Sequence, residues 1–266
     1  MTEAEWLTAE KPTPMVEFVR GRVGHWKLRL FAVACCRRIQ HLFADGRSRE
    51  AVEVAERYAI GSVSDRDRFE AHVAADLAET EIADAYLPNH GEDSDDWLAE
   101  VGLDAGAAAN TATLASSDQP EGMDPDTWRT LFAGRPFIPG QYSTHEEAQR
   151  ALAHAVRPLR YEEIEWRDGA DRANAKCDEA VSQAELLRCV VGNPFRPVTF
   201  SPDWLTPTAV GLAEGIYEDR AFDRLPILAD ALQDAGCEDA AILAHCRGDG
   251  LHVRGCWVVD GVLGKG

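Results

Sequence analysis

Helical periodicity runs through most of this 266-residue chain and constrains its fold more than any other sequence feature. Apolar residues recur at helical spacings, and Ser or Thr stands where several of the expected helices begin. Only residues 198–200 and 251–253 are candidates for minor strands. The sequence therefore predicts an all-α, multi-helix globular protein with little or no β structure.

The strongest helical pattern of the N-terminal half covers residues 27–43. Its apolar residues lie on more than one face, which is typical of a helix that is buried on most sides. Thr2 and Glu5 have the spacing of a capping box and predict a short helix over 4–9. We expect the helix over 27–43 to be central to an N-terminal core.

The last third of the chain, residues 193–266, carries the clearest local signals. Three prolines and three aromatic residues interleave over 193–204 and predict an extended arm. Thr206 and Pro207 predict the start of a helix that runs to residue 218, and Gly236 closes a helix over 224–235. Further helices are expected over 238–247 and 256–263, so this part is predicted to form a compact helical unit.

Composition divides the chain into four segments. Residues 1–115 form an N-terminal helical region, 116–143 a long loop or linker, 144–192 a charged helical segment, and 193–266 the C-terminal helical unit. The loop assignment rests on four prolines and three glycines within residues 116–143. The C-terminal unit and the N-terminal helices are also compatible with one shared domain.

Acidic side chains dominate the charge, and the formal net charge is −19. Most of the excess lies in residues 53–131, which contain 19 acidic and 4 basic residues. This segment repels phosphate backbones and anionic lipid heads, so neither nucleic-acid nor membrane binding is expected. A basic partner remains compatible with the charge.

The sequence favours a cytoplasmic protein. The longest apolar stretch, residues 30–36, is far shorter than the about 20 residues that span a bilayer. The first residues contain neither the basic nor the apolar region of a secretion signal. Seven cysteines are an odd number in a chain long enough to fold without disulfides, so we expect reduced thiols.

One Cys/His-rich stretch near the C-terminus has the composition of a metal site. It contains Cys237, His245, Cys246, His252 and Cys256. Thiolate and imidazole are preferred ligands of Zn²⁺, and four of them in tetrahedral arrangement form a structural site. His245 and Cys246 project about 100° apart on a helix, so only one of them is expected to bind a given ion. The competing interpretation, which the general behaviour of free cysteines favours, is that the cysteines are small core residues and the histidines are polar edges of a helix.

Catalytic motifs are not evident in the sequence. A nucleophile pair of Cys246 and His252 has no flanking signature that supports it. Asp93, Asp95 and Asp96 lack the glycine and the final glutamate of an EF-hand loop. The common nucleotide-binding, hydrolase and metalloprotease motifs are missing, so no catalytic or cofactor-binding residue is predicted.

A basic patch follows the strongest N-terminal helix and consists of Arg37, Arg38, Arg47 and Arg49. Cations near a helix C-terminus complement its dipole, and they pair readily with nearby carboxylates. We therefore expect these arginines to pair within the protein, with an anion site as the alternative.

Two parts of the chain, about residues 1–60 and 186–266, carry a family resemblance. They are similar to a family of planctomycete bacterial proteins in the stretches MTEAEWL, KLRLFAVACCRRIQHLF and REAVEVAERYA, and in NPFRP, WLTP, RAFDRLPILADAL, HCR and HVRGCWVVD. The stretch AFDRLPILADALQDAGC also resembles the repeat-companion module that occurs beside leucine-rich repeats in those bacteria. The resemblance implies a bacterial source and supports the segmentation above, but it implies no activity, cofactor or catalytic residue.

These observations favour a non-enzymatic helical interaction or scaffold protein with an unidentified protein partner. Short helices beside an aromatic and proline-rich arm offer surfaces for docking. Three alternatives remain: a zinc-stabilised binding module that uses the C-terminal Cys and His residues, an enzyme of unrecognised type, and an acidic mimic of nucleic acid.

Overall fold

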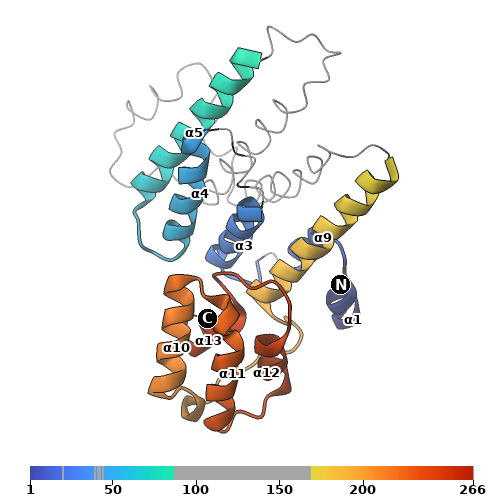
Figure 1. Ribbon diagram of the computed structural model, residues 1–266, viewed down its shortest axis with the longest axis vertical. Helices are drawn as coiled ribbons and strands as arrows, with labels where there is room; N and C mark the ends of the chain where they lie inside the picture. The colour runs from blue at the N-terminus through green and yellow to red at the C-terminus, as the bar shows by residue number, and fades with distance from the viewer. Residues whose placement is uncertain (20, 39, 41–42, 44, 87–168, 266) are drawn as a thin grey trace. The chain divides into compact units, whose positions relative to one another are not determined.

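The computed structural model describes residues 1–19, 21–38, 40, 43, 45–86 and 169–265 (Figure 1). The chain divides into two compact units. We call Met1–Val23 with Ala180–Gly266 the terminal unit, and Gly24–Glu179 the central unit. Every secondary-structure element in the described ranges is helical, which confirms the predicted all-α class for this part of the chain. No helix described here is long and apolar enough to cross a membrane.

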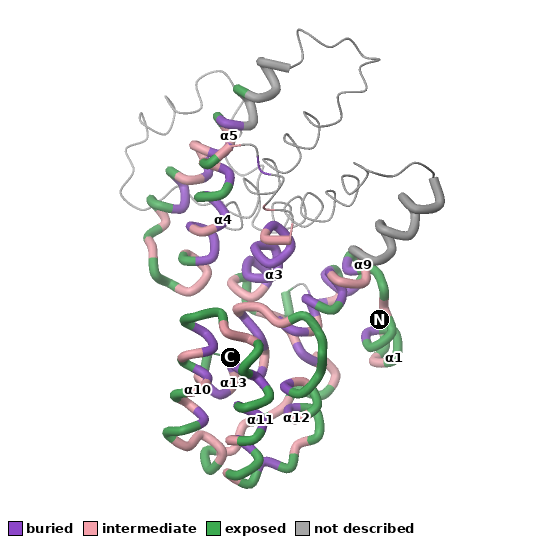
Figure 2. The backbone as a smooth tube through the Cα atoms, viewed as in Figure 1, coloured by how far each residue is buried: buried purple, intermediate pink, exposed green. Residues whose placement is uncertain are grey.

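Among the described residues, three helices lie wholly in the central unit: α3 (His25–Arg38), α4 (Gly46–Ala59) and α5 (Asp65–Tyr86). α3 packs on α4, and α4 packs on α5. Nine consecutive residues of α3, from Leu28 to Cys36, are buried (Figure 2). This confirms that the helix is buried on most sides, although it ends at Arg38 and not at residue 43 as predicted.

The terminal unit joins both ends of the chain. Its helices are α1 (Glu3–Thr8), α2 (Pro12–Val19), the last part of α9 (Gly169–Val191), η4 (Pro202–Trp204), α10 (Pro207–Asp219), η5 (Phe222–Arg224), α11 (Leu225–Asp234), α12 (Ala240–Arg247) and α13 (Trp257–Val262). α11 packs on both α10 and α12, and α13 contacts the same two helices. Buried aliphatic side chains such as Ile216, Leu228 and Ile242 form the core of this helical unit.

The boundaries of the units differ in position from those drawn on composition. The first 23 residues pack with the C-terminal unit, while the described residues from 24 to 86 belong to the central unit. The candidate loop 116–143 lies outside the described residues. Residues 198–200 and 251–253 are irregular, so the two candidate strands were wrong. A strand needs a paired neighbour, and the described part of the chain offers none.

Helix ends follow the predicted capping signals. Oγ1 of Thr2 accepts the Glu5 N–H at 3.3 Å, and Oε2 of Glu5 accepts the Thr2 N–H at 2.7 Å, which completes the capping box of α1. Thr206 caps α10 by accepting the Ala209 N–H at 3.2 Å. Gly236 follows α11 with φ +89°, a left-handed conformation that glycine adopts without steric cost.

The last turn of α9 holds the N-terminal helix in place. The Trp6 indole Nε1 donates to the Gly192 carbonyl at 3.1 Å, and Nε of Arg188 donates to the Trp6 carbonyl at 3.1 Å. Nδ2 of Asn193 donates to Oε1 of Glu3 at 2.8 Å. Trp6 is fully buried, so α1 is an integral part of the terminal unit's core.

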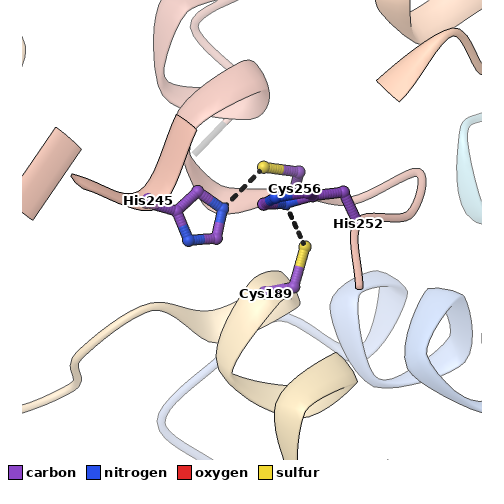
Figure 3. Close-up of side chains that lie close together, drawn as sticks. All are labelled: Cys189, His245, His252 and Cys256. Atoms are coloured by element: carbon purple, nitrogen blue, oxygen red, sulfur yellow. Dashed lines mark hydrogen bonds between the residues drawn. The ribbon is translucent and has the colours of Figure 1, made fainter. Parts of the chain in front are cut away.

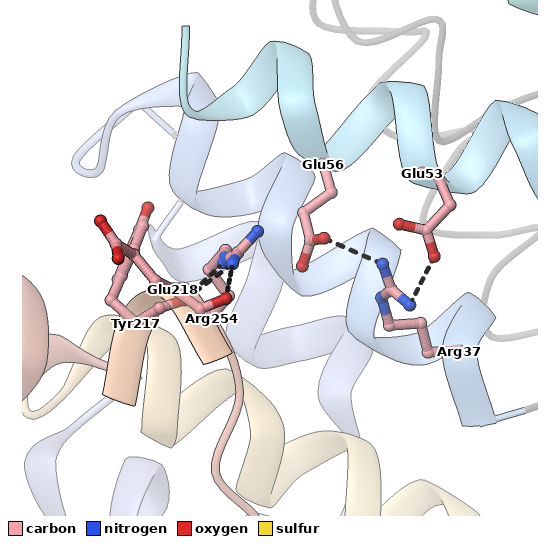
Figure 4. A network of polar contacts seen from close by, with 6 residues as sticks. All are labelled: Arg37, Glu53, Glu56, Tyr217, Glu218 and Arg254. Atoms are coloured by element: carbon pink, nitrogen blue, oxygen red, sulfur yellow. Dashed lines mark hydrogen bonds and ion pairs between the residues drawn. The ribbon is translucent and has the colours of Figure 1, made fainter. Parts of the chain in front are cut away.

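The basic patch of the central unit pairs internally, as predicted for Arg37 and Arg47. Arg37 contacts Glu53 at 2.8 Å and Glu56 at 2.9 Å, and so connects α3 to α4 (Figure 4). Arg47 pairs with Asp45 at 2.9 Å. These contacts give both arginines a structural role.

An arginine of the terminal unit closes the end of α10 (Figure 4). Nη2 of Arg254 donates to the carbonyls of Tyr217 at 2.7 Å and Glu218 at 3.0 Å. A cation at a helix C-terminus satisfies carbonyls that have no partner within the helix and complements the helix dipole. Arg254 therefore fixes the segment between α12 and α13 on α10.

Candidate metal centre

Four metal-ligating side chains converge inside the terminal unit (Figure 3). Cys189 comes from the last turn of α9, and His245 from the last turn of α12. Cys256 is the N-cap residue of α13, and His252 lies between α12 and α13. We call these four residues the Cys₂His₂ cluster. Two helix ends, one helix start and one loop therefore supply its four side chains.

The donor atoms of the cluster are close enough to share one ion. One ligand atom from each residue belongs to a group in which all distances are within 4.8 Å. Nε2 of His245 lies 3.2 Å from Sγ of Cys256, and Sγ of Cys189 lies 3.7 Å from Nδ1 of His252. Bonds of about 2.3 Å from zinc to sulfur and about 2.0 Å to nitrogen, at tetrahedral angles, place the two donors about 3.5 Å apart. The two observed distances bracket this value.

Both sulfur atoms of the cluster belong to buried residues. Cys256 is 0% exposed and Cys189 is 2% exposed. Burial alone raises the pKa of the Cys256 thiol, but hydrogen bonds with Cys189, His245 and His252 hold that pKa well below its ordinary value. The thiolate is the form of cysteine that binds a metal ion. The surroundings of Cys256 therefore favour its ligating form.

His252 is not fully satisfied by the protein. Its Nδ1 faces Cys189, while its Nε2 is buried and has no hydrogen-bond partner. Buried polar atoms without a partner are rare in native proteins, and a bound water or ion often satisfies such an atom. Nδ1 is the ring nitrogen that faces a cluster sulfur, so Nδ1 and not Nε2 fits a metal ion shared with Cys189.

Aromatic packing orients the two imidazoles. The rings of His245 and His252 meet edge to face with centroids 4.8 Å apart. Trp257 of α13 covers His245 with a centroid distance of 5.3 Å. The same indole lies against Gly192, where an added Cβ would come within 3.0 Å of the ring. Trp257 therefore contacts both the cluster residue His245 and the residue that follows α9.

Three of the five predicted ligands meet in the structure: His245, His252 and Cys256. Cys237 and Cys246 do not belong to the group, and both are buried. Burial raises the pKa of Cys246 to about 12, which disfavours the thiolate. Of the neighbours His245 and Cys246 only His245 joins the cluster, in line with their divergence on the helix.

The fourth member, Cys189, was missed by sequence reasoning. It lies in the apolar end of α9, next to the buried residues Leu187 and Val190, and its pattern is that of an ordinary core cysteine. No spacing motif connects it to the C-terminal stretch, because 56 residues separate it from His245. A search that paired every cysteine of an apolar helix end with the C-terminal histidines would have included it.

Other candidate sites from the sequence gain no support. Asp93, Asp95 and Asp96 lie outside the described residues. The Cys₂His₂ cluster is the one group of three or more His, Cys, Asp or Glu side chains with metal-site geometry that the described residues contain.

The chemistry of the donor set indicates which ions the cluster fits. No family model, curated protein or solved structure matches this chain, so its own residues alone indicate what the site binds. Two thiolates and two imidazoles are soft and borderline donors that suit Zn²⁺ in tetrahedral geometry. Hard cations such as Ca²⁺ and Mg²⁺ prefer oxygen ligands, which this group does not offer.

Proposed function

We propose that the terminal unit is a zinc-stabilised helical binding module in which Cys189, His245, His252 and Cys256 hold a structural Zn²⁺ ion. The observation that carries this proposal is the convergence of the four ligand atoms within 4.8 Å of one another. The donor set and the sulfur-to-nitrogen distances support it.

Four protein ligands favour a structural role over a catalytic one. Catalytic zinc sites have three protein ligands and leave the fourth position to water or substrate. Here the protein supplies all four donors, and both cysteines are buried away from solvent. This burial also disfavours Cys256 as a nucleophile, because reactive cysteines are partly exposed. The cluster therefore supports the non-enzymatic interpretation of the sequence.

The structural effect of the ion would be to join two distant parts of the chain. Three ligands lie within residues 245–256, whereas Cys189 lies at the end of α9. A metal ion adds its binding free energy to folding when the unfolded chain has no preformed site. Zinc would thus hold α9 against the segment between α12 and α13.

We assign the binding role of the module to its helical surface and not to the zinc site. A closed, four-ligand site offers no position for a substrate, so recognition of a partner would depend on the surface of the helices that zinc stabilises. We propose a protein partner, because the acidic composition disfavours nucleic acid and anionic lipid.

Elemental analysis of the full chain, purified without chelators and with zinc supplied, tests the proposal. We expect about one equivalent of zinc per chain and its loss in Cys189→Ser and His252→Ala. Cys246→Ala is the matched control, since this buried cysteine lies beside His245 but outside the cluster. Titration with Co²⁺ should give the absorption bands of a tetrahedral thiolate site. Less than about 0.2 equivalents of zinc in the wild-type chain would refute the proposal.

A further inference from the structure

The cluster and the N-terminal segment Met1–Val23 are attached to the same turn of α9. Arg188, directly before the ligand Cys189, donates to the carbonyls of Trp6 and Ala9. Gly192, three residues after the ligand, accepts the Trp6 indole at 3.1 Å. If this turn unfolds, the position of the ligand Cys189 and the contacts that hold α1 are therefore disturbed together.

The residues after α9 extend the same attachment. Glu3 accepts a hydrogen bond from Asn193 at 2.8 Å and pairs with Arg196 at 2.6 Å. Phe195 stacks on Phe18 of α2, with centroids 5.0 Å apart and ring planes 10° apart. Both helices of the N-terminal segment are thus held by residues that follow the ligand Cys189 within seven positions.

A second route joins the cluster to the same turn through packing. The Trp257 ring contacts the ligand His245 on α12, and it also lies against Gly192. The carbonyl of Gly192 in turn holds Trp6. The docking site of Trp6 therefore contacts the cluster both along α9 and through the Trp257 side chain.

We propose that metal binding at the Cys₂His₂ cluster and docking of the N-terminal segment on the end of α9 are coupled, so that each strengthens the other. This inference rests on the proposed zinc site and concerns its regulation. The last turn of a helix frays readily because its carbonyls lack partners within the helix. A metal ion on Cys189 holds this turn, and a formed turn presents Arg188 and Gly192 to α1. Coupling of this kind is reciprocal by thermodynamic necessity.

Hydrogen exchange of the full chain measures the first direction of the coupling. We expect amides of α1 and α2 to exchange roughly tenfold faster after zinc is removed by a chelator, within the range of typical coupling strengths. Helix α4 of the central unit is the internal reference, and its exchange should stay unchanged. Equal protection of α1 and α2 with and without zinc would overturn the proposal.

Zinc affinity of variants measures the reverse direction. Glu3→Gln removes the ion pair with Arg196 and weakens the contact with Asn193, and it replaces a partly exposed side chain with one of the same shape. Trp6→Phe keeps an aromatic ring but removes the hydrogen bond to Gly192. Glu70→Gln is the control, because it removes an exposed ion pair of the central unit with Arg66.

The outcomes separate this proposal from the zinc site itself. We expect zinc dissociation constants to rise about fivefold in Glu3→Gln and Trp6→Phe, and to stay unchanged in Glu70→Gln. Zinc affinities within twofold of the wild-type value in both variants would overturn the coupling while leaving the zinc site in place. If the wild-type chain binds no zinc, the proposed function fails first, and this inference fails with it.

Discussion

Sγ of Cys189 and Nδ1 of His252 lie 3.7 Å apart although 63 residues separate them in the chain. This contact connects the end of α9 to the loop between α12 and α13. Each of the two residues alone resembles an ordinary buried or partly buried side chain. Together with His245 and Cys256 they form a group whose ligand atoms lie within 4.8 Å of one another, and only the fold brings these four residues together.

Removal of zinc should lower the stability of the terminal unit. A ligand that binds only the folded state, at a free concentration about 100 times its dissociation constant, stabilises that state by about 2.7 kcal/mol. Urea unfolding with buffered zinc and with chelator measures the difference. The Cys189→Ser variant should show the same unfolding midpoint in both conditions. An identical midpoint for the wild-type chain in both conditions would contradict a structural metal.

Helices were predicted well because their signals are local. The capping box of Thr2 and Glu5, the cap at Thr206 and the left-handed Gly236 each depend on residues a few positions apart. The end of α3 was misplaced because an apolar pattern continues beyond Arg38. The assignment of residues 1–23 to the terminal unit depends on the contact of Trp6 with Gly192, which no local pattern encodes.

The site was predicted in part for the same reason. His245, His252 and Cys256 lie within one short stretch, and their proximity in the chain made them candidates. Cys246 occupies the same stretch but points to the core, because it neighbours His245 on a helix. Cys189 could not be assigned, since its contact with the others arises only when α9 packs in the terminal unit.

Replacing Arg37 with Gln should destabilise the central unit. Arg37 pairs with Glu56, whose side chain is only 3% exposed, and the substitution removes this charge partner. Removing one partner of a mostly buried pair costs about 1–3 kcal/mol, because the remaining charge stays out of water. Arg66→Gln breaks an exposed pair with Glu70 and should leave the unfolding free energy nearly unchanged. Equal effects of the two substitutions in urea unfolding would contradict a structural role for Arg37.

Cys36 should make the protein less stable at alkaline pH. Burial raises the pKa of its thiol from 9.0 to about 12. The unfolded chain therefore loses the thiol proton near pH 9 while the folded chain keeps it, so the contribution is intact below pH 9 and declines between pH 9 and 12. At pH 10 the loss is about 1 kcal/mol. Unfolding free energies of the wild type and Cys36→Ala between pH 8 and 10.5 test this, and parallel pH profiles would show that Cys36 contributes nothing.

Alanine substitutions at Gly192 and Gly236 distinguish the cost of backbone strain from the cost of a new contact with Trp257. Gly192 and Gly236 both have positive φ, at +75° and +89°, so alanine at either position carries about 1–2 kcal/mol of left-handed strain. Only at Gly192 would the new Cβ meet a side chain, the Trp257 ring at 3.0 Å, whereas the space beside Gly236 is open. We therefore expect Gly192→Ala to cost about 1–3 kcal/mol more than Gly236→Ala in urea unfolding, because overpacking adds to strain.

Since Trp257 also packs on His245, Gly192→Ala should weaken zinc binding as well, while Gly236→Ala should leave the zinc dissociation constant unchanged. Equal zinc affinities in the two variants would show that the packing of Trp257 does not support the cluster.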